Sequence, residues 1–308
     1  MNEFELINRY FNWSLSDPSI ELGVGDDAAL FEIDADCQLV TSTDTLSEGV
    51  HFFKDALPGD IAYKSLAVNL SDIAAMGAKA KYFTLSLTLP KLDEIWLKEF
   101  SESLKEASEF FKVSLIGGDT TKGPLNITIT IMGVVKKSKA IKRSGAKNGD
   151  DIYVSGDIGD AALCLKKINE GIKPNSSELN KLNQPVPRVK LGPSLINIAS
   201  ACIDISDGLE QDLTHILRAS KVGAIIDSQS LPLSDSVKDF LKTSQDLGLP
   251  LCGGDDYELC FTSDQSNQME IKKISESLNI RITKIGVINN SQTLEIRGYK
   301  GSSKSYQH

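Results

Sequence analysis

The chain has 308 residues, 41% of them hydrophobic and 24% charged, which is the composition of a folded globular protein with room for about two domains. Its formal net charge is −9. A protein that binds nucleic acid through the phosphate backbone needs a field of Lys and Arg, so this acidic balance argues against nucleic acid as the main partner.

No segment predicts export or membrane insertion. The N-terminal stretch MNEFELINRYFN is a candidate amphipathic helix of mixed charge rather than a signal peptide, and no apolar run is long enough to cross a membrane. The five cysteines show neither Cys-x-x-Cys pairs nor the Cys/His spacing of a zinc site. We therefore expect a cytoplasmic protein with reduced thiols and without zinc.

The first half of the chain alternates between strand and helix patterns. Apolar and polar side chains alternate over 38–45, 81–90 and 125–135, which is the period of half-buried strands. Helical spacing of apolar residues covers 60–78 and 92–111. Because the strands come in pairs around helices, we predict an α+β unit in which helices cover a mixed or antiparallel sheet.

A basic, glycine-containing stretch over 136–150 has no apolar period, so we place the domain junction there, with domains at 1–137 and 138–308. In the second domain the pattern predicts a helix over 207–220. It predicts strands over 151–156, 201–206, 257–262 and 281–288.

Five short segments place acids beside Gly, Ser or Thr, at strand ends or on a helix rich in small residues. A single Asp after Gly is usually a turn or helix-cap residue. Five such segments together weaken that explanation. The segments are GDD (25–27), STD (42–44), NLSDIAAMGA (69–78), GGDTT (117–121) and DISDG (204–208).

Asp72 is the least turn-like of these acids, because it lies in mid-helix among small residues that favour close packing. Desolvating a carboxylate costs several kcal/mol unless a cation or hydrogen-bond donors compensate. Two carboxylates about 4 Å apart also repel by about 4 kcal/mol at an effective dielectric of about 20. Lys and Arg are absent from the five segments. We therefore predict bound metal ions beside these acids, including the adjacent Asp26 and Asp27.

Carboxylates together with the hydroxyls of Ser42 and Thr43 offer hard oxygen ligands, which suit Mg²⁺ better than transition metals. Such sites usually share Mg²⁺ with the phosphates of a nucleotide, which points to ATP. The sequence has no Walker A loop, no Gly-x-Gly-x-x-Gly and no protein-kinase catalytic signature. Metal ions would then hold the phosphates, helped by the backbone of Gly117 and Gly118 and by Arg143, although a basic residue in a junction is more often simply solvated.

Two further segments are weaker candidates on their own. His51 follows the STD segment after a short loop, but a lone histidine is more often a packing or surface residue. GGDDYELCF (253–261) repeats the Gly-Gly-acid theme before a predicted strand, and by itself it could be a turn.

Seven segments, in this order and spacing, closely resemble the thiamine-monophosphate kinase family of the aminoimidazole ribonucleotide synthetase superfamily over nearly the whole chain. The resemblance implies a two-domain fold of that superfamily, with an N-terminal mixed sheet that pairs in a homodimer and a C-terminal α/β-type domain that completes the active-site cleft. It also implies an enzyme that uses ATP and several Mg²⁺ ions to convert thiamine monophosphate to thiamine diphosphate and ADP. The segments are GVGDDAAL, STDTLSEGVHF, AYKSLAVNLSDIAAMGA, LIGGDTTKGP, RSGAKNGD, IDISDGL and GGDDYELCF.

The resemblance also implies roles residue by residue. The implied magnesium ligands are Asp27, Ser42, Thr43, Asp44, Asp72, Asp119, Asp204 and Asp207, among which we expect Asp27, Asp44, Asp72, Asp119 and Asp207 to be catalytic. The implied nucleotide contacts are Gly118, Asp119, Arg143 and Ser206, and the implied thiamine-monophosphate contacts are His51, Asp255 and Tyr306.

The chain departs from the family's pattern at two places. Asp255 stands where the family usually has Glu, so the acid on the substrate side is one methylene shorter. The usual tail, Gly-Tyr-x-His-Phe, is replaced by Ser305-Tyr306-Gln307-His308, which puts Tyr306 in a different context.

The chemistry of the acceptor predicts the mechanism. A phosphate monoester is largely ionised at neutral pH, so its oxygen is already a nucleophile and needs no general base. We predict direct in-line transfer of the γ-phosphoryl group, with Mg²⁺ holding donor and acceptor. Two alternatives stay open at this point. One is another ATP-dependent enzyme of the superfamily, such as aminoimidazole ribonucleotide synthetase or selenophosphate synthetase, and the other is a non-catalytic protein that binds magnesium-nucleotide.

Overall fold

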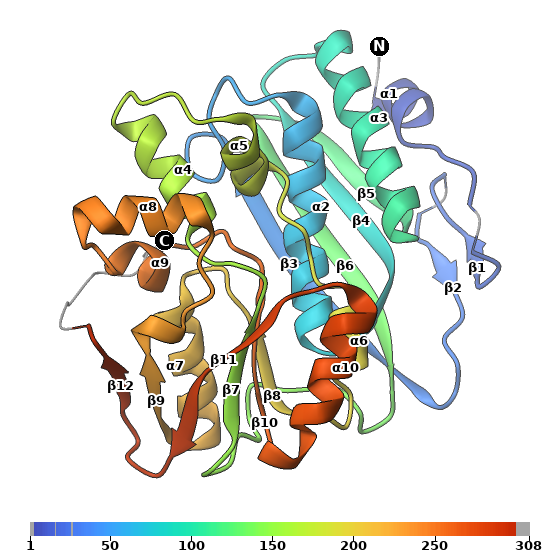
Figure 1. Ribbon diagram of the computed structural model, residues 1–308. Helices are drawn as coiled ribbons and strands as arrows, with labels where there is room; N and C mark the ends of the chain where they lie inside the picture. Colours follow the sequence, from blue (N-terminus) through green and yellow to red (C-terminus); the bar gives the residue numbers. More distant parts are fainter. Residues whose placement is uncertain (1–2, 16, 26, 300–308) are drawn as a thin grey trace. The chain divides into compact units, whose positions relative to one another are not determined.

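The computed structural model describes residues 3–15, 17–25 and 27–299. These residues form two compact units (Figure 1). Unit 1 comprises the described residues of Met1–Ile73 and Ala78–Ser138, and unit 2 those of Ala74–Gly77 and Lys139–His308. Among the described residues, no helix has the length and apolar character needed to cross a membrane.

Unit 1 is built on a four-stranded sheet in the order β3-β6-β4-β5. Strand β6 pairs antiparallel with both of its neighbours, whereas β4 and β5 are parallel, so the sheet is mixed as predicted. Three of these strands match the predicted alternating segments, and β5 is an additional strand that contains the GGDTT segment. The strands are β3 (Cys37–Ser47), β4 (Lys79–Leu89), β5 (Ser114–Lys122) and β6 (Asn126–Lys136).

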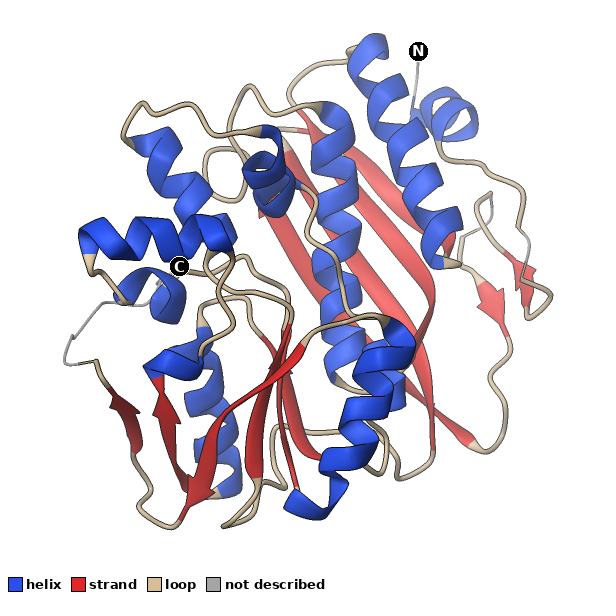
Figure 2. Cartoon of the chain, in the orientation of Figure 1, coloured by secondary structure: helices blue, strands red, loops and turns tan. Residues whose placement is uncertain are grey.

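Helices α2 (Pro58–Ala75) and α3 (Glu94–Phe111) cover one face of this sheet (Figure 2). Helix α3 begins where the Asp93 carboxylate accepts a hydrogen bond from the Trp96 N–H at 3.2 Å, an N-cap of the usual kind. Apolar side chains at helical and alternating spacing fill the space between helices and sheet. The buried set includes Leu66, Leu70, Ile73, Leu97, Phe100, Leu104, Ile127, Ile129 and Ile131.

A short N-terminal section packs beside α3. Helix α1 (Glu3–Tyr10) is followed by Phe11, whose ring lies 6.4 Å from that of Phe100 on α3. The strands β1 (Ile20–Leu22) and β2 (Leu30–Phe31) then form a small antiparallel pair, and Gly25 and Asp27 lie in the chain between them.

Unit 2 contains a six-stranded sheet in the order β12-β9-β11-β7-β10-β8. Its pairs are antiparallel except for the parallel pair β9 and β12. Its strands are β7 (Asp151–Ser155), β8 (Ala199–Asp204), β9 (Gly223–Asp227), β10 (Leu259–Ser263), β11 (Ile282–Asn289) and β12 (Leu294–Arg297). Its helices are α4 (Asp160–Asn169), α5 (Ser176–Asn183), α6 (Leu191–Ser194), α7 (Leu209–Ser220), α8 (Asp235–Ser244), α9 (Gly248–Cys252) and α10 (Gln268–Leu278), with one-turn helices η1 (Ser228–Ser230) and η2 (Gln265–Asn267).

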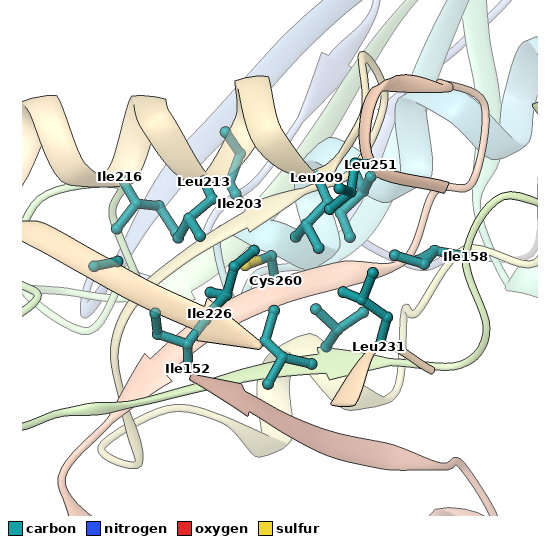
Figure 3. Close-up of a cluster of buried hydrophobic side chains, with 14 of the residues drawn as sticks. Ile152, Ile158, Ile203, Leu209, Leu213, Ile216, Ile226, Leu231, Leu251 and Cys260 are labelled. Atoms are coloured by element: carbon teal, nitrogen blue, oxygen red, sulfur yellow. The ribbon is translucent and has the colours of Figure 1, made fainter. Parts of the chain in front are cut away.

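Both faces of the unit 2 sheet are buried at strands β7, β8 and β10. Ile152 and Ile203 point into one apolar cluster together with Leu213 of α7 (Figure 3). Tyr153 and Phe261, at alternate positions, belong to a second cluster with Ile271 of α10. Strands buried on both faces with helices on either side are typical of an α/β-type layer, and the two units together confirm the predicted α+β fold class.

Candidate active site

In unit 1, helix α2 contacts strand β3 through polar side chains. The Ser42 hydroxyl donates a hydrogen bond to Asp72 Oδ2 at 2.5 Å. The Asp44 N–H donates to Asn69 Oδ1 at 3.1 Å, and Asn69 is fully buried. Three of the predicted ligands therefore lie along one contact between a strand and a helix. Sequence reasoning missed Asn69, although it stands three residues before Asp72 in the same NLSD motif.

The alternation of β3 separates Thr43 from its neighbours. Ser42 and Asp44 lie opposite the buried Ile131 and Ile129 of β6, on the helix-covered face. Thr43 points the other way, and its hydroxyl is 2.9 Å from the Thr130 hydroxyl. A metal contact by Thr43 would therefore have to use its main chain.

A cavity of about 630 Å³ in unit 1 brings together three more predicted residues. Asp27, Gly118 and Asp119 line it, together with residues of α1 and others between β1 and β2. Asp27 and Asp119 are exposed, so their carboxylates are accessible to an ion. Asp26 and Tyr306 lie outside the described residues.

Gly118 is required by its close contact with β4. A Cβ atom at this position would lie 1.9 Å from the carbonyl oxygen of Leu85, and the backbone φ is +157°. Only glycine fits, and the exposed backbone beside it can be approached closely by a ligand.

His51 lies in a tight turn after β3. Its ring Nδ1 accepts a hydrogen bond from the Ser47 N–H at 3.1 Å, and its backbone N–H donates to the Ser47 carbonyl at 3.0 Å. The ring is therefore held against the turn by its Nδ1 atom.

In unit 2, the DISDG segment is held by a residue that sequence reasoning missed. The N–H groups of Ser206 and Asp207 both donate to Asp212 Oδ2 at 3.0 Å. Burial raises the pKa of Asp212 to about 7, and the charge of Asp207 acts in the same direction. The sequence did contain a signal for Asp212, namely an acid that lies five residues after Asp207 among the apolar residues of α7. Asp204 is buried at the end of β8.

The GGDDY segment is hydrogen-bonded to the DISDG segment. The Asp255 N–H donates to the Ser206 carbonyl at 2.9 Å, and a Cβ on Gly254 would lie 2.2 Å from that same oxygen. Asp255 and Tyr257 both have positive φ, and the Tyr257 hydroxyl donates to Asp255 Oδ1 at 3.0 Å. Such strained positions are often found at functional sites. Unit 2 thus brings a predicted nucleotide contact and a predicted substrate contact together.

Arg143 lies near α7. Its carbonyl accepts a hydrogen bond from the Ser220 hydroxyl at 3.2 Å. Burial and the positive charge of Arg143 lower the pKa of His215 on that helix. The exposed guanidinium is therefore close enough to act on groups of the helix that follows the DISDG segment.

The oxygen donors described above fit the chemistry of a hard divalent cation. They lie in pairs, with Asp27 and Asp119 lining one cavity and Ser42 in contact with Asp72. Among the described residues, three acid, His or Cys ligand atoms come within 4.8 Å of one another only at Asp34, Asp36 and Cys37, a mainly exposed group in which Asp36 pairs with Lys136.

The family follows from comparison with known proteins. Residues 25–135 match the N-terminal domain, and residues 147–298 the C-terminal domain, of the AIR synthase related proteins. The chain therefore belongs to this class of two-domain proteins.

The comparison also identifies the branch of the class. The chain is 45% identical over 300 residues to a thiamine-monophosphate kinase of Buchnera aphidicola subsp. Schizaphis graminum, covering 94% of this chain and 92% of the relative. The crystal structure of thiamine-monophosphate kinase from Stenotrophomonas maltophilia K279a is 42% identical, with a TM-score of 0.90 and 97% coverage of each chain. The structure of AaThiL complexed with AMPPCP and TMP is 28% identical, with a TM-score of 0.81, covering 99% of this chain and 95% of that one. The chain belongs to the thiamine-monophosphate kinase family, which confirms the resemblance seen in its motifs.

Proposed function

We propose that this protein transfers the γ-phosphoryl group of ATP to thiamine monophosphate, giving thiamine diphosphate and ADP. The observation that carries this function is the cavity of unit 1 that Asp27, Gly118 and Asp119 line. The family match over nearly the whole chain supports it. AaThiL carries AMPPCP and TMP together, which supports ATP and thiamine monophosphate as the two substrates.

ATP is assigned to the cavity of unit 1. Its volume of about 630 Å³ is within the usual range of small-molecule sites, and it combines apolar side chains such as Ile7 and Phe11 with acids at its edge. Gly118 offers backbone to the nucleotide, while Arg143 and Ser206 are assigned as contacts from unit 2. We also assign metal and ATP binding to residues 1–137 and the remaining ligands of the site to residues 138–308.

Magnesium is the metal that the donor set suits, because the assigned ligands are carboxylates, the Ser42 hydroxyl and, for Thr43, a main-chain oxygen. When bound, Mg²⁺ would neutralise phosphate charge and so allow ATP and a second phosphate to lie among acidic side chains. Asp27 and Asp119 would hold it in the cavity, and Asp44 and Asp72 on the β3–α2 contact. Ser42 and Thr43, with Asp204 and Asp207 of unit 2, complete the proposed set.

The protein's own part in the transfer is positioning. The acceptor is a phosphate oxygen that is ionised at neutral pH, so no side chain has to remove a proton. His51, Asp255 and Tyr306 are assigned to thiamine monophosphate, and Tyr257 holds the carboxylate of Asp255. In-line attack then depends on how well these contacts align the two phosphates.

We further propose that the protein is a cytoplasmic homodimer. The sheet face of unit 1 opposite α2 and α3 carries paired threonine hydroxyls, with Thr45 and Thr128 2.8 Å apart, and Leu39 is 45% exposed on it. Such a face is suited to pairing with a second copy. The five cysteines are free, as a reducing compartment requires.

Incubation with ATP, Mg²⁺ and either thiamine or thiamine monophosphate, followed by identification of the products, tests the function. Thiamine diphosphate and ADP should form only from thiamine monophosphate. If no product forms from either acceptor, another reaction of the superfamily or a non-catalytic nucleotide-binding protein would be favoured.

A further inference from the structure

Lys64 is a buried lysine that the proposed mechanism leaves unused. It lies in α2 and is 4% exposed. Its Nζ donates a hydrogen bond to the carbonyl oxygen of His51 at 3.3 Å. Lysine is almost never this buried without a partner, because its ammonium group loses its hydration. The contact with the His51 carbonyl is one of the contacts that offset this loss.

The turn that Lys64 contacts is closed by its own hydrogen bonds. The Gly49 N–H donates to the Phe52 carbonyl at 2.8 Å, and the Ser47 N–H donates to His51 Nδ1 at 3.1 Å. A ring nitrogen that accepts a hydrogen bond carries no proton, so the neutral imidazole has its proton on Nε2. The turn thus fixes the tautomer of His51 and the direction of its Nε2–H group.

Lys64 is the first of three α2 side chains that hold β3 and the turn after it. Lys64 contacts His51, Asn69 contacts Asp44, and Asp72 contacts Ser42. The helix and the strand therefore run in opposite directions along this contact. The Asn69 and Asp72 contacts lie on a strand that β6 already holds in register. The Lys64 contact lies beyond the end of β3, where the ladder with β6 no longer supports the backbone.

We propose that Lys64 is a positioning residue for thiamine monophosphate. By holding the His51 carbonyl, it adds a contact from α2 to the turn's own hydrogen bonds and so keeps the imidazole in the form that presents Nε2–H to the substrate. This inference rests on the proposed function, because that function assigns His51 to the substrate. It predicts that Lys64 acts through His51 and affects binding of the acceptor, not of ATP.

The first test reads the imidazole directly and needs no turnover. The chain has only three histidines, so their ring nitrogens can be assigned in a long-range ¹H–¹⁵N spectrum. Wild-type His51 should show the single Nε2–H tautomer, and Lys64→Met should convert it to an exchanging mixture. Lys64→Arg should retain the wild-type pattern. His215 lies in unit 2 and should not change in any variant, which makes it an internal reference. An unchanged His51 pattern in Lys64→Met would overturn the proposal.

The second test separates acceptor binding from ATP binding. Lys64→Met should raise KM for thiamine monophosphate on the order of tenfold, the effect of losing about one charge-assisted hydrogen bond, and change kcat and KM for ATP by less than about twofold. Lys64→Arg should restore most of the loss. In a His51→Ala background, Lys64→Met should have no further effect on KM. Independent, additive effects of the two substitutions would overturn the proposal.

A matched control and a second variant keep the result interpretable. Lys98 lies on α3 of the same unit with a 68% exposed side chain, so Lys98→Met should leave all values unchanged. If Lys64→Met does not fold, Lys64→Gln, which keeps a polar side chain but loses the charge, replaces it in both tests. Absence of turnover in the wild type would refute the proposed function, while the spectrum would still decide whether Lys64 positions His51.

Discussion

Asp72 and Asp212 are both helical aspartates, but their carboxylates lie in different surroundings. Asp72 is half-buried and accepts a hydrogen bond from a side-chain hydroxyl, that of Ser42. Asp212 is 3% exposed and accepts two backbone N–H groups, so it fixes the main chain of the DISDG segment. A carboxylate that binds a hydroxyl can exchange that contact for a metal ion, whereas one that caps backbone donors maintains the local fold.

Substitution Asp72→Asn tests the charge at the β3–α2 contact. The amide has nearly the same size and its oxygen still accepts the Ser42 hydroxyl, so we expect the thermal midpoint to change by only a few degrees. Turnover should fall by about a hundredfold or more, because a neutral ligand stabilises a phosphate-bound cation far less. Thiamine-monophosphate-dependent release of ADP measures this. Asp235→Asn, at a 97% exposed position on α8, is the control and should retain full activity. A fully active Asp72→Asn enzyme would show that this charge is not needed.

Asp212 predicts a pH dependence of stability whose sign can be derived. Its pKa is raised to about 7 in the folded state, against about 3.9 in an unfolded chain. Above pH 4 the unfolded carboxyl loses its proton while the folded one keeps it, so the contribution of Asp212 falls by about 1.4 kcal/mol per pH unit, until the folded group also ionises at about pH 7. The total is about 4 kcal/mol.

Asp212→Asn removes this titration. We expect the free energy of unfolding of wild type minus variant to decrease as the pH rises from 4 to 7, and to change little above 8. Urea unfolding in the presence of a chelator measures the difference, because a cation near Asp207 would alter the titration. A difference that is constant with pH would contradict the assignment of a raised pKa.

At the scale of elements, the sequence patterns were most reliable where strands and helices are long. The period of two predicted β3, β4 and β6, and the helical spacing predicted α2 and α3, because each element buries one face over many residues. Strand β5 was missed because its glycines and threonines are typical of a loop. Strands β9 and β12, which have only five and four residues, were also missed.

The candidate site could be predicted only in part. The motifs supplied the acids, since each lies in a short recognisable segment. The partners that hold those acids, such as Asn69 for Asp44 and Asp212 for Asp207, depend on how a helix packs against a strand or loop. Local periodicity contains no information on that packing.

Strand β5 offers a paired test of backbone approach. Gly118→Ala would place a methyl group 1.9 Å from the Leu85 carbonyl oxygen, so β4 and β5 would have to separate. We expect a loss of about 2 kcal/mol or more in the free energy of unfolding and a rise of about tenfold in KM for ATP. Gly117→Ala is the matched control for stability, because a Cβ there meets no atom within 4 Å and should leave the free energy of unfolding unchanged. Equal loss of stability in the two variants in urea unfolding would refute the role of Gly118.

At the scale of the whole molecule, the proposed homodimer depends on the threonine face of unit 1. Thr128 lies on β6, one of the two inner strands of the sheet, and is half-buried, with its hydroxyl 2.8 Å from that of Thr45. The alternating residues Ile127 and Ile129 are fully buried on the other face, so a substitution at Thr128 does not enter the core. This makes Thr128 a suitable position for testing the face without unfolding the unit.

Thr128→Arg should convert a homodimer into a monomer. In a twofold dimer the substitution occurs twice, and each unpaired guanidinium buried in the interface costs several kcal/mol. Light scattering after size-exclusion chromatography should give a dimer mass for the wild type and a monomer mass for the variant, with an unchanged far-UV spectrum. Thr243→Arg, at an exposed position on α8, makes the same change elsewhere and should leave the mass unchanged. A monomer mass for the wild type would exclude the homodimer. A dimer mass for Thr128→Arg would exclude pairing through this face, because it would mean that the arginine reaches solvent and that the interface lies elsewhere.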